Sequence, residues 1–372
     1  MRRSIPRRFE HCRAIGLSAA LFALLTLCPA GCPTSDTSDG TASGMDGGST
    51  FDQATPVAFN DAGATTFTDT IATSSDIDLF DLGKLAPGDR VRIDVQATSA
   101  DLDPVAALFD QRDYVHAFND DRVPDASNLN PLIDVTIRGA EGNYLLGVAS
   151  FPATNTTGPY RVSVQITRGG GDATPQPQTV FLNWQGGSSI VLENVGTFDL
   201  APFDAASVGF PGRTAAMKQR VQQIAADRYA GFNLLLLNSD DNAEPTTPHS
   251  TVYFGGASDA AFAISEQIDT HNADHNDDSI IFTEGFPGSF RHTPTFEEMA
   301  TAIGNTTAHE IGHLLGLVHT RDCDELMDTN CGNDSILVAQ SFGLGPLDDS
   351  VFPLGFQNAP ELIGWIIGLT GG

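Results

Sequence analysis

The chain has 372 residues, of which 41% are apolar, and its 47 acidic residues outnumber 19 basic ones for a net charge of −28. This composition is that of a globular protein, and the length is sufficient for two domains. The acidic excess argues against nucleic acid as a partner, because phosphate groups would be repelled, and it disfavours binding to anionic lipid surfaces. Solubility, calcium sites or a saline habitat would each account for the charge.

The N-terminus has the composition of an export signal. A basic stretch, Met1–Arg13, precedes the apolar and uncharged stretch Ala14–Leu27. Fourteen residues rise only about 21 Å as a helix, which is too short to span a bilayer core of about 30 Å. We therefore expect residues 1–31 to be a signal peptide and the protein to be exported, with a short buried helix as the alternative.

Ala30-Gly31-Cys32 resembles the end of a bacterial lipoprotein signal, in which the cysteine is lipidated and becomes the new N-terminus. Pro29 departs from this pattern, which usually has leucine there. Residues 32–50 are rich in Ser, Thr, Gly and Asp, a composition typical of a flexible tether. The resemblance implies lipidation of Cys32 and an outer-membrane lipoprotein in the cell envelope, and the alternative is secretion to the extracellular space. We expect no other contact with a membrane.

Residues 51–168 have the pattern of β-structure. Short apolar or alternating segments are bounded by Gly, Pro, Asp or Asn, and no helical stretch interrupts them. The pattern predicts an all-β antiparallel sandwich. The predicted strands are Arg90–Ala97, Pro104–Asp110, Leu132–Gly139, Asn143–Ser150 and Tyr160–Thr167.

The order of these segments resembles the bacterial pre-peptidase C-terminal domain, a jelly-roll-like sandwich found beside secreted peptidases. Five polar residues in its turns are candidate oxygen ligands for Ca²⁺, which favours several carboxylates. Solvated turn residues are the alternative explanation. The candidates are Asp76, Asp78, Asn119, Asp120 and Asp121.

Residues 169–178, with three glycines and two prolines, form a linker to a different kind of domain over residues 179–372. Strands and helices alternate there, which predicts a mixed α/β (α+β) domain. Thr295 and Glu298 predict a capping box at the start of a long helix. The expected strands are 179–184, 233–239, 251–256 and 279–284. The expected helices are 214–231, a long helix from 295 and a closing helix at 359–369.

The long helix carries three of the chain's nine histidines in the segment AHEIGHLLGLVHT. His309 and His313 are four residues apart, so they share a helix face and both imidazoles can reach one zinc ion. Gly316 allows a sharp turn that brings His319 back as a third ligand. Three protein ligands leave a fourth position for water, the arrangement of a catalytic zinc ion. Glu310 is placed to act as general base on that water.

The pattern H-E-x-x-H-x-x-G-x-x-H, with Met327 eight residues after His319, resembles the signature and methionine turn of the metzincin peptidases. The resemblance implies an exported zinc endopeptidase with one catalytic Zn²⁺ and a protein or peptide substrate, bound extended along an edge strand. Among metzincins it is most similar to matrixins, because no tyrosine follows the methionine. Gly316 and Met327 would support the site without binding the metal.

Two of the five cysteines leave with the signal peptide and Cys32 would carry lipid, which leaves Cys323 and Cys331. In an oxidising compartment these two are expected to form a disulfide around Met327, with free thiols as the alternative. The loop Asp269–Ser279 has residue types that suit Ca²⁺ or structural zinc, as in matrixin loops, or it is a solvated acidic loop. Its candidates are His271, Asp274, His275, Asp277 and Asp278, while His249 and His292 are expected at the surface.

The sequence leaves two other functions open. One is a surface binding or adhesion protein whose zinc site is structural or vestigial, although a purely structural site has no need of Glu310. The other is hydrolysis of a non-peptide amide. Cleavage preference, physiological substrate, oligomeric state and the role of the first domain do not follow from the sequence.

Overall fold

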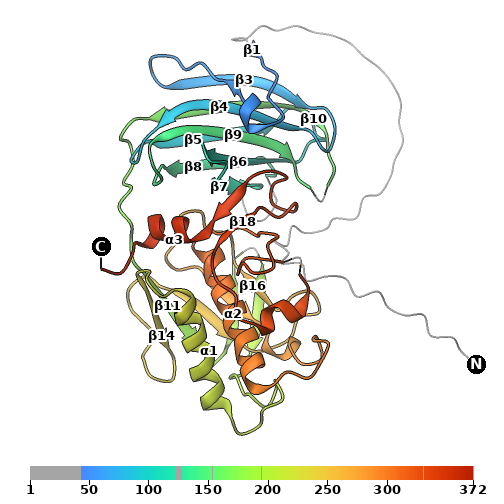
Figure 1. Ribbon diagram of the computed structural model, residues 1–372, viewed down its shortest axis with the longest axis vertical. Helices are drawn as coiled ribbons and strands as arrows, with labels where there is room; N and C mark the ends of the chain where they lie inside the picture. The colour runs from blue at the N-terminus through green and yellow to red at the C-terminus, as the bar shows by residue number, and fades with distance from the viewer. Residues whose placement is uncertain (1–42, 123–127, 153, 194, 330, 372) are drawn as a thin grey trace, which may run out of the picture.

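The computed structural model describes residues 43–122, 128–152, 154–193, 195–329 and 331–371. The predicted signal peptide, residues 1–31, and the predicted lipidation site, Cys32, lie outside the described residues. The described part of the chain is β-rich and multidomain, with three α-helices (Figure 1). We call residues 43–168 the sandwich and residues 178–371 the C-terminal half. No helix in the described ranges is both long and apolar enough to cross a membrane.

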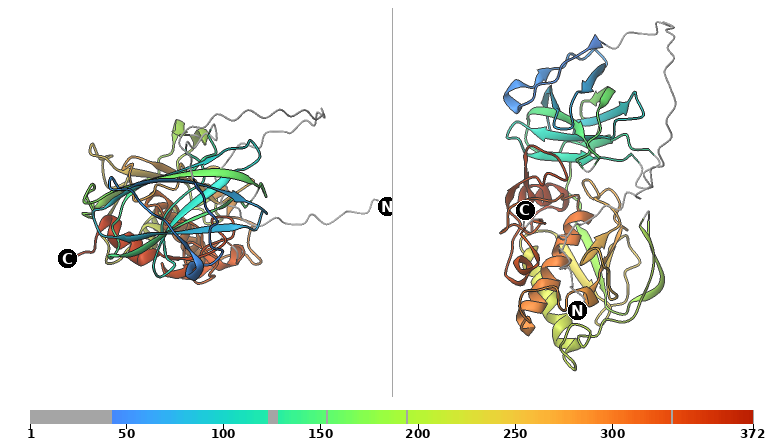
Figure 2. Two further views of the ribbon diagram at one scale, coloured as in Figure 1. Left: turned by 90° about the horizontal axis from the view of Figure 1, so that it is seen from above. Right: turned by 90° about the vertical axis from the view of Figure 1, so that its right-hand side faces the viewer.

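The sandwich consists of two five-stranded sheets that face one another (Figures 1 and 2). Phe67 from one sheet and Phe80 from the other pack with ring centroids 4.6 Å apart in the core between them. Neighbouring strands are antiparallel, except that β1 and β2 add parallel strands at two edges. The first sheet has the order β1 (Ser43–Gly44), β3 (Ala64–Ile71), β10 (Gly158–Thr167), β5 (Arg90–Ala97) and β8 (Leu132–Thr136). The second has the order β2 (Thr55–Pro56), β4 (Ile77–Leu85), β9 (Gly142–Ser150), β6 (Pro104–Asp110) and β7 (Val115–Asn119).

The five strands predicted for the sandwich are confirmed, with β8 ending three residues early. Part of the expected tether, residues 45–48, contacts the sandwich. Met45 N donates to Thr68 O at 2.9 Å, and Gly48 and Leu79 exchange two backbone hydrogen bonds. The edges of β3 and β4 have backbone groups that need partners, and this glycine-rich segment approaches closely enough to supply them.

The C-terminal half is built on one mixed sheet. Its strands β14, β11, β15 and β17 run parallel, and β16 lies antiparallel to β17 at the edge. The order is β14 (Leu234–Asn238), β11 (Gln178–Asn183), β15 (Ser250–Phe254), β17 (Asp278–Ile281) and β16 (Ala263–Ser265). Two hairpins accompany it, β12 (Gly187–Leu192) with β13 (Gly196–Leu200) and β18 (Leu344–Pro346) with β19 (Phe356–Asn358).

Three helices complete this half: α1 (Thr214–Arg228), α2 (Phe296–Leu314) and α3 (Ala359–Ile367). The predicted buried face of α1, which includes Met217 and Val221, is confirmed in the main core. The predicted capping box is also present, because Thr295 Oγ1 accepts from Glu298 N and Glu298 Oε2 accepts from Thr295 N at 2.7 Å. This cap fixes where α2 begins, and the helix is almost wholly buried from Met299 onward.

The sandwich and the C-terminal half share a hydrophobic core. Phe109 and Val105 on the outer face of β6 pack with Val318, Leu347 and Phe352. The Phe109 and Phe352 ring centroids are 5.4 Å apart. Burial on both faces explains why β6 has a continuous apolar run instead of an alternating one. The segment coloured red in Figures 1 and 2, with β18 and α3, lies between the sandwich and the rest of the C-terminal half.

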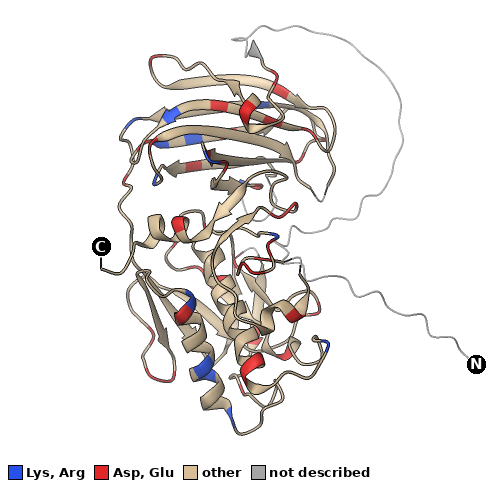
Figure 3. Cartoon of the chain, in the orientation of Figure 1, with Lys and Arg blue, Asp and Glu red and all other residues tan. Residues whose placement is uncertain are grey.

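Polar contacts surround this shared core. Arg112 pairs with Glu361 of α3 at 3.0 Å, and His271 Nε2 donates to His116 O at 2.8 Å. Phe356 N donates to Asp113 O at 2.9 Å, which places β19 beside the sandwich. Acidic residues, in contrast, are scattered over both halves in the view of Figure 3. The contact is therefore apolar at its centre and polar at its rim.

We expect Phe352→Ala to lower the free energy of unfolding by about 3–5 kcal/mol, because it removes a fully buried ring from the shared core. Chemical denaturation followed by circular dichroism and by tryptophan fluorescence should give one coincident transition at a lower midpoint. Leu235→Ala, at a side chain that is 54% exposed, is the control and should change little. An unchanged midpoint for Phe352→Ala would contradict the shared core.

The sandwich contains a buried acid, Asp78, whose Oδ2 accepts from Tyr160 Oη at 2.7 Å. Burial, with smaller contributions from nearby acidic residues, raises the pKa of Asp78 from 3.8 to about 7, and the Tyr160 hydrogen bond opposes this effect. The folded state therefore holds a proton that the unfolded state releases near pH 4. The stability that this proton contributes is complete below pH 4 and is lost as the pH rises through about 7.

We expect Asp78→Asn, which keeps an oxygen acceptor for Tyr160, to gain stability over the native chain as the pH rises from 4 to 7. Urea denaturation at several pH values measures this difference. Asp61→Asn, at an exposed position, removes the same charge and should show no such trend. A constant difference between Asp78→Asn and the native chain across this pH range would refute the assignment.

Candidate metal centre

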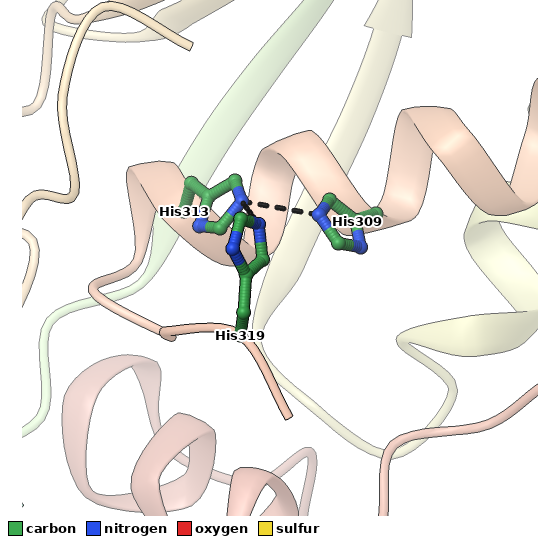
Figure 4. Close-up of side chains that lie close together, drawn as sticks. All are labelled: His309, His313 and His319. Carbon is green, nitrogen blue, oxygen red and sulfur yellow. Dashed lines mark hydrogen bonds between the residues drawn. The ribbon is translucent and has the colours of Figure 1, made fainter. Parts of the chain in front are cut away.

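Three histidine side chains converge at the end of α2. His309 and His313 project from the last turns of the helix, and His319 reaches them from the segment that follows (Figure 4). His313 Nε2 lies 3.1 Å from His309 Nε2 and 3.0 Å from His319 Nε2. The three rings form a group that can hold a metal ion.

Backbone carbonyls fix the orientation of two of these rings. His309 Nδ1 donates to Leu326 O and His313 Nδ1 donates to Leu317 O, each at 2.8 Å. A carbonyl oxygen only accepts, so the proton of each neutral ring is on Nδ1 and the Nε2 lone pair is free. The lone pairs therefore point toward the common centre.

The histidines are neutral in this environment. Burial, with a smaller contribution from the nearby His309, lowers the pKa of His319 to about 3. Burial and the two neighbouring rings hold the pKa of His313 well below 6.5, and burial also lowers the pKa of His309. Neutral imidazoles are the form that binds a metal ion.

The donor set fits a zinc ion. A tetrahedral Zn²⁺ with Zn–N bonds of about 2.0–2.1 Å holds its nitrogens about 3.3–3.4 Å apart, close to the spacing of the Nε2 atoms here. Without a cation the facing Nε2 lone pairs of His309 and His313 would repel one another in a buried site. Imidazole nitrogens are among the common ligands of Zn²⁺, and three of them are found in catalytic sites. The residues thus suit the predicted metal in number, chemistry and spacing.

Glu310 lies on the helix between the first two histidines and is only 4% exposed. Its Oε2 accepts from Ser265 Oγ at 2.7 Å. Burial raises the pKa of Glu310 to about 7, and the Ser265 hydrogen bond opposes this effect. Ser265 belongs to the edge strand β16, which the sequence did not predict.

Gly316 allows the turn that returns His319 to the centre. Its φ of +91° lies in the region that favours glycine. A Cβ atom at this position would also lie 2.7 Å from Asp269 O and 2.8 Å from His271 N. The turn therefore requires glycine both for its backbone conformation and for the close approach of the loop that begins at Asp269.

Met327 forms the floor of the centre against α2, where a Cβ on Gly312 would lie 2.8 Å from its Sδ. Glu325 supports it from below: Glu325 Oε2 accepts from Met327 N at 2.7 Å and from Thr320 Oγ1 at 2.6 Å. Glu325 was not among the residues predicted from the sequence. An acidic residue two positions before Met327 is a signal that could have been noticed.

Gln357 holds the chain just before His319. Its Oε1 accepts from Val318 N and its Nε2 donates to Val318 O, both at 2.8 Å. The side chain thus replaces a neighbouring strand and fixes the backbone beside the third histidine. No pattern in the sequence indicates this role, because Gln357 is 38 residues away from the histidine.

The predicted disulfide between Cys323 and Cys331 is present. It closes a loop around Met327, and the segment that follows Cys331 lines a pocket beside His309 and Glu310. The two sulfur atoms and Asp328 lie close together, but oxidised cysteines offer no thiolate for a metal ion. The pair is therefore a structural link.

The candidate calcium ligands of the sandwich do not form a single site. Asp76 and Asp78 are at the start of β4, whereas Asn119 ends β7 and Asp120 follows it. The sheet order β4-β9-β6-β7 separates the two groups by three strand spacings, or roughly 14 Å. Asn119 Oδ1 is also occupied by Leu132 N at 2.8 Å. The expectation of one cluster, which included Asp121, is therefore wrong.

The loop Asp269–Ser279 is neither a metal cluster nor a solvated loop. His271 contacts the sandwich, His275 Nδ1 bonds to Gln178 Oε1 at 2.7 Å, and Asp278 Oδ1 accepts from Thr251 N. Asp277 is 1% exposed, and burial raises its pKa to about 9, whereas Asp274 is exposed. No three of the loop's candidate ligands meet among the described residues.

His292 is exposed, as expected, and pairs with Glu298 at 3.2 Å. His249 is only partly exposed, and its Nδ1 bonds to Thr247 O at 2.8 Å. Neither of them belongs to the group of three histidines at the end of α2.

A pocket opens beside His309 and Glu310. One wall is formed by residues 261–263, which lead into and begin β16, and a second wall by residues between 326 and 340. Asn305 and Thr306 of α2 also line the pocket. Asn305 Nδ2 donates to Ile336 O at 3.0 Å and to Val338 O at 2.7 Å, which ties the second wall to the helix. Asn305 was not among the residues predicted from the sequence.

Comparisons with known proteins do not assign a family. No family model and no curated protein matches the chain. Solved structures give weak likenesses. The periplasmic lysozyme inhibitor PliG of Aeromonas hydrophila is 17% identical with a TM-score of 0.24, over 30% of this chain and 95% of that one. The pre-peptidase C-terminal domain of a Bacillus anthracis collagenase is 18% identical with a TM-score of 0.23, over 30% and 93%. Archaemetzincin of Methanopyrus kandleri is 8% identical with a TM-score of 0.26, over 45% and 89%. These TM-scores are too low to assign a fold or a function.

We expect His319→Ala to weaken zinc binding by more than roughly 100-fold, because it removes one of three donors. Competition with a chromophoric chelator measures the affinity, and circular dichroism checks that the variant is folded. His292→Ala is the control, because its ring is exposed and distant from the group of three. Equal zinc affinity of His319→Ala and the native chain would contradict the assignment.

Proposed function

We propose that the protein is an exported zinc endopeptidase, with His309, His313 and His319 as metal ligands and Glu310 as general base. The observation that carries the proposal is the buried Glu310 carboxylate on the same helix end as three convergent imidazoles. A structural zinc site fills its fourth position with a protein ligand, whereas the group at the end of α2 consists, among the described residues, of the three histidines alone.

The metal and the base have complementary tasks. Zinc bound to the three histidines supplies Lewis acidity, which lowers the pKa of a bound water and polarises a carbonyl group. Glu310 takes the proton of the attacking water and passes it to the leaving amine. The carboxylate is buried beside the three imidazoles, which is where both proton transfers would take place.

The edge strand β16 offers a place for an extended peptide. Phe282 N donates to Phe262 O at 2.7 Å and Glu266 N donates to Asp278 O at 3.0 Å. In an antiparallel pair the direction of these bonds alternates, so the backbone groups of Ala263 and Ser265 face away from β17. No described strand pairs with this outer edge. A substrate strand added there would pass beside the pocket at His309 and Glu310.

The pocket is the proposed site for a substrate side chain next to the cleaved bond. Phe262, Leu326 and Ile336 supply apolar surface in its walls. His309 and Glu310 also line the pocket, so a substrate side chain bound there would place the neighbouring carbonyl group close to the metal centre. We therefore propose a preference for an apolar residue at that position.

The remaining parts of the proposal depend on the N-terminal sequence. A signal peptide over residues 1–31 and lipidation of Cys32 would place the protein in the cell envelope, with a protein or peptide as its substrate. Independently of the N-terminal sequence, we also propose domain boundaries at residues 168 and 178.

We expect Glu310→Gln to lower kcat/KM by roughly 10²–10⁴-fold, because it removes the proton acceptor and keeps the shape of the side chain. The measurement is cleavage of a mixed peptide library by the full chain loaded with zinc, with mass spectrometry of the products. Glu297→Gln is the matched control, since this acid lies on the same helix with a side chain 65% exposed.

Loss of cleavage in Glu310→Gln with unchanged zinc content supports the peptidase. If the native chain holds zinc but cuts no peptide, the proposal fails and a binding or adhesion protein with a structural zinc site takes its place. Hydrolysis of small amides without cleavage of peptides would instead favour a non-peptide amidase.

A further inference from the structure

Ser265 stands between the edge strand and the proposed base. Its hydroxyl donates to Glu310 Oε2 at 2.7 Å and lies 3.3 Å from Glu310 O. The residue is the last of β16, and the serine is only partly exposed. The sequence predicted neither this strand nor a partner for Glu310.

The same residue faces the proposed substrate edge with its backbone. Its N–H and C=O point away from β17, because residues 262, 264 and 266 are the positions whose backbone groups face the neighbouring strand. A peptide that adds to β16 would therefore bond to the backbone of Ser265, whose side chain holds the carboxylate of Glu310. Ser265 is thus part of the proposed substrate edge and is also hydrogen-bonded to the proposed base, Glu310.

We propose that Ser265 is a positioning residue, which holds the Glu310 carboxylate at the metal centre and couples its orientation to the binding of a peptide along β16. This inference rests on the proposed peptidase function. The carboxylate of Glu310 can rotate about its terminal bond, and a hydrogen bond to Oε2 selects one orientation and leaves Oε1 to receive the proton. A peptide paired with the outer edge would fix β16 and the serine with it.

The neighbouring strand supplies a matched control. Ser279 of β17 lies directly opposite Ser265 in the register, so both side chains are on one face of the sheet. Ser279 is fully buried, and its hydroxyl has no hydrogen-bond partner within the described part of the chain. Loss of this hydroxyl tests the effect of removing a serine from the sheet without touching Glu310.

The experiment compares kcat and KM of the zinc-loaded full chain with those of Ser265→Ala, Ser265→Thr and Ser279→Ala. We expect Ser265→Ala to lower kcat by roughly 10-fold with KM changed less than about 2-fold, because the loss affects the base and not the strand. Ser265→Thr keeps the hydroxyl and suits a strand, so it should restore most of kcat. Ser279→Ala should match the native chain.

Crystal structures of the native chain and Ser265→Ala give a readout that does not depend on activity. We expect the Glu310 carboxylate to occupy a new or second orientation in the variant, with zinc content unchanged. The same orientation in both structures, or equal kcat values for Ser265→Ala and Ser279→Ala, would overturn the inference. If the native chain does not cleave peptides, the proposed function fails, and the carboxylate orientation still tests the positioning role.

Discussion

The meeting of three neutral imidazoles in a buried site is the constraint on which the C-terminal half depends. Their Nε2 atoms lie 3.0–3.1 Å apart along two sides of the group, and two of the rings have their only proton committed to a carbonyl. Lone pairs at this distance repel one another unless a cation lies between them. The site is thus preorganised for a metal ion, and its surroundings hold the rings in a position that they would otherwise leave.

The supporting side chains are polar and buried, as expected around a metal site. Glu325 fixes Met327, Gln357 fixes Val318, and Asn305 ties the pocket wall to α2. Each of these three side chains forms hydrogen bonds with backbone groups of irregular segments, which have no neighbouring helix or strand to pair with them. The sandwich contributes from outside, because its apolar face packs on Val318 beside the third histidine. It is therefore part of the scaffold of the site as well as a separate pair of sheets.

The sequence predicted the elements whose signals are local. The i, i+4 spacing of His309 and His313 depends on one helix, and the capping box at Thr295 depends on four residues, so both could be predicted. The long apolar strands of the sandwich also have a local pattern. The run of β6 is apolar throughout because it is covered on both faces, but the sequence does not reveal that the second cover is the C-terminal half.

The remaining features depend on contacts between distant segments. Strand β16 has three residues, too few for a pattern, and exists because β17 pairs with it. Ser265 meets Glu310 across 45 residues, and Gln357 meets Val318 across 39. The acidic loop at Asp269 has a composition typical of solvated loops, yet it is partly buried because α2 and the sandwich pack against it. The residue types of this loop therefore suggested metal ligands, whereas in the fold the same side chains make structural contacts.

The most direct test of the central claim is anomalous scattering at the zinc absorption edge from a crystal of the zinc-loaded full chain. We expect one strong peak bonded to His309, His313 and His319 at about 2.0–2.1 Å, with a fourth ligand that is water and lies within reach of Glu310. A peak with a fourth protein ligand would indicate a closed structural site, and the absence of zinc between the three rings would contradict the metal centre itself.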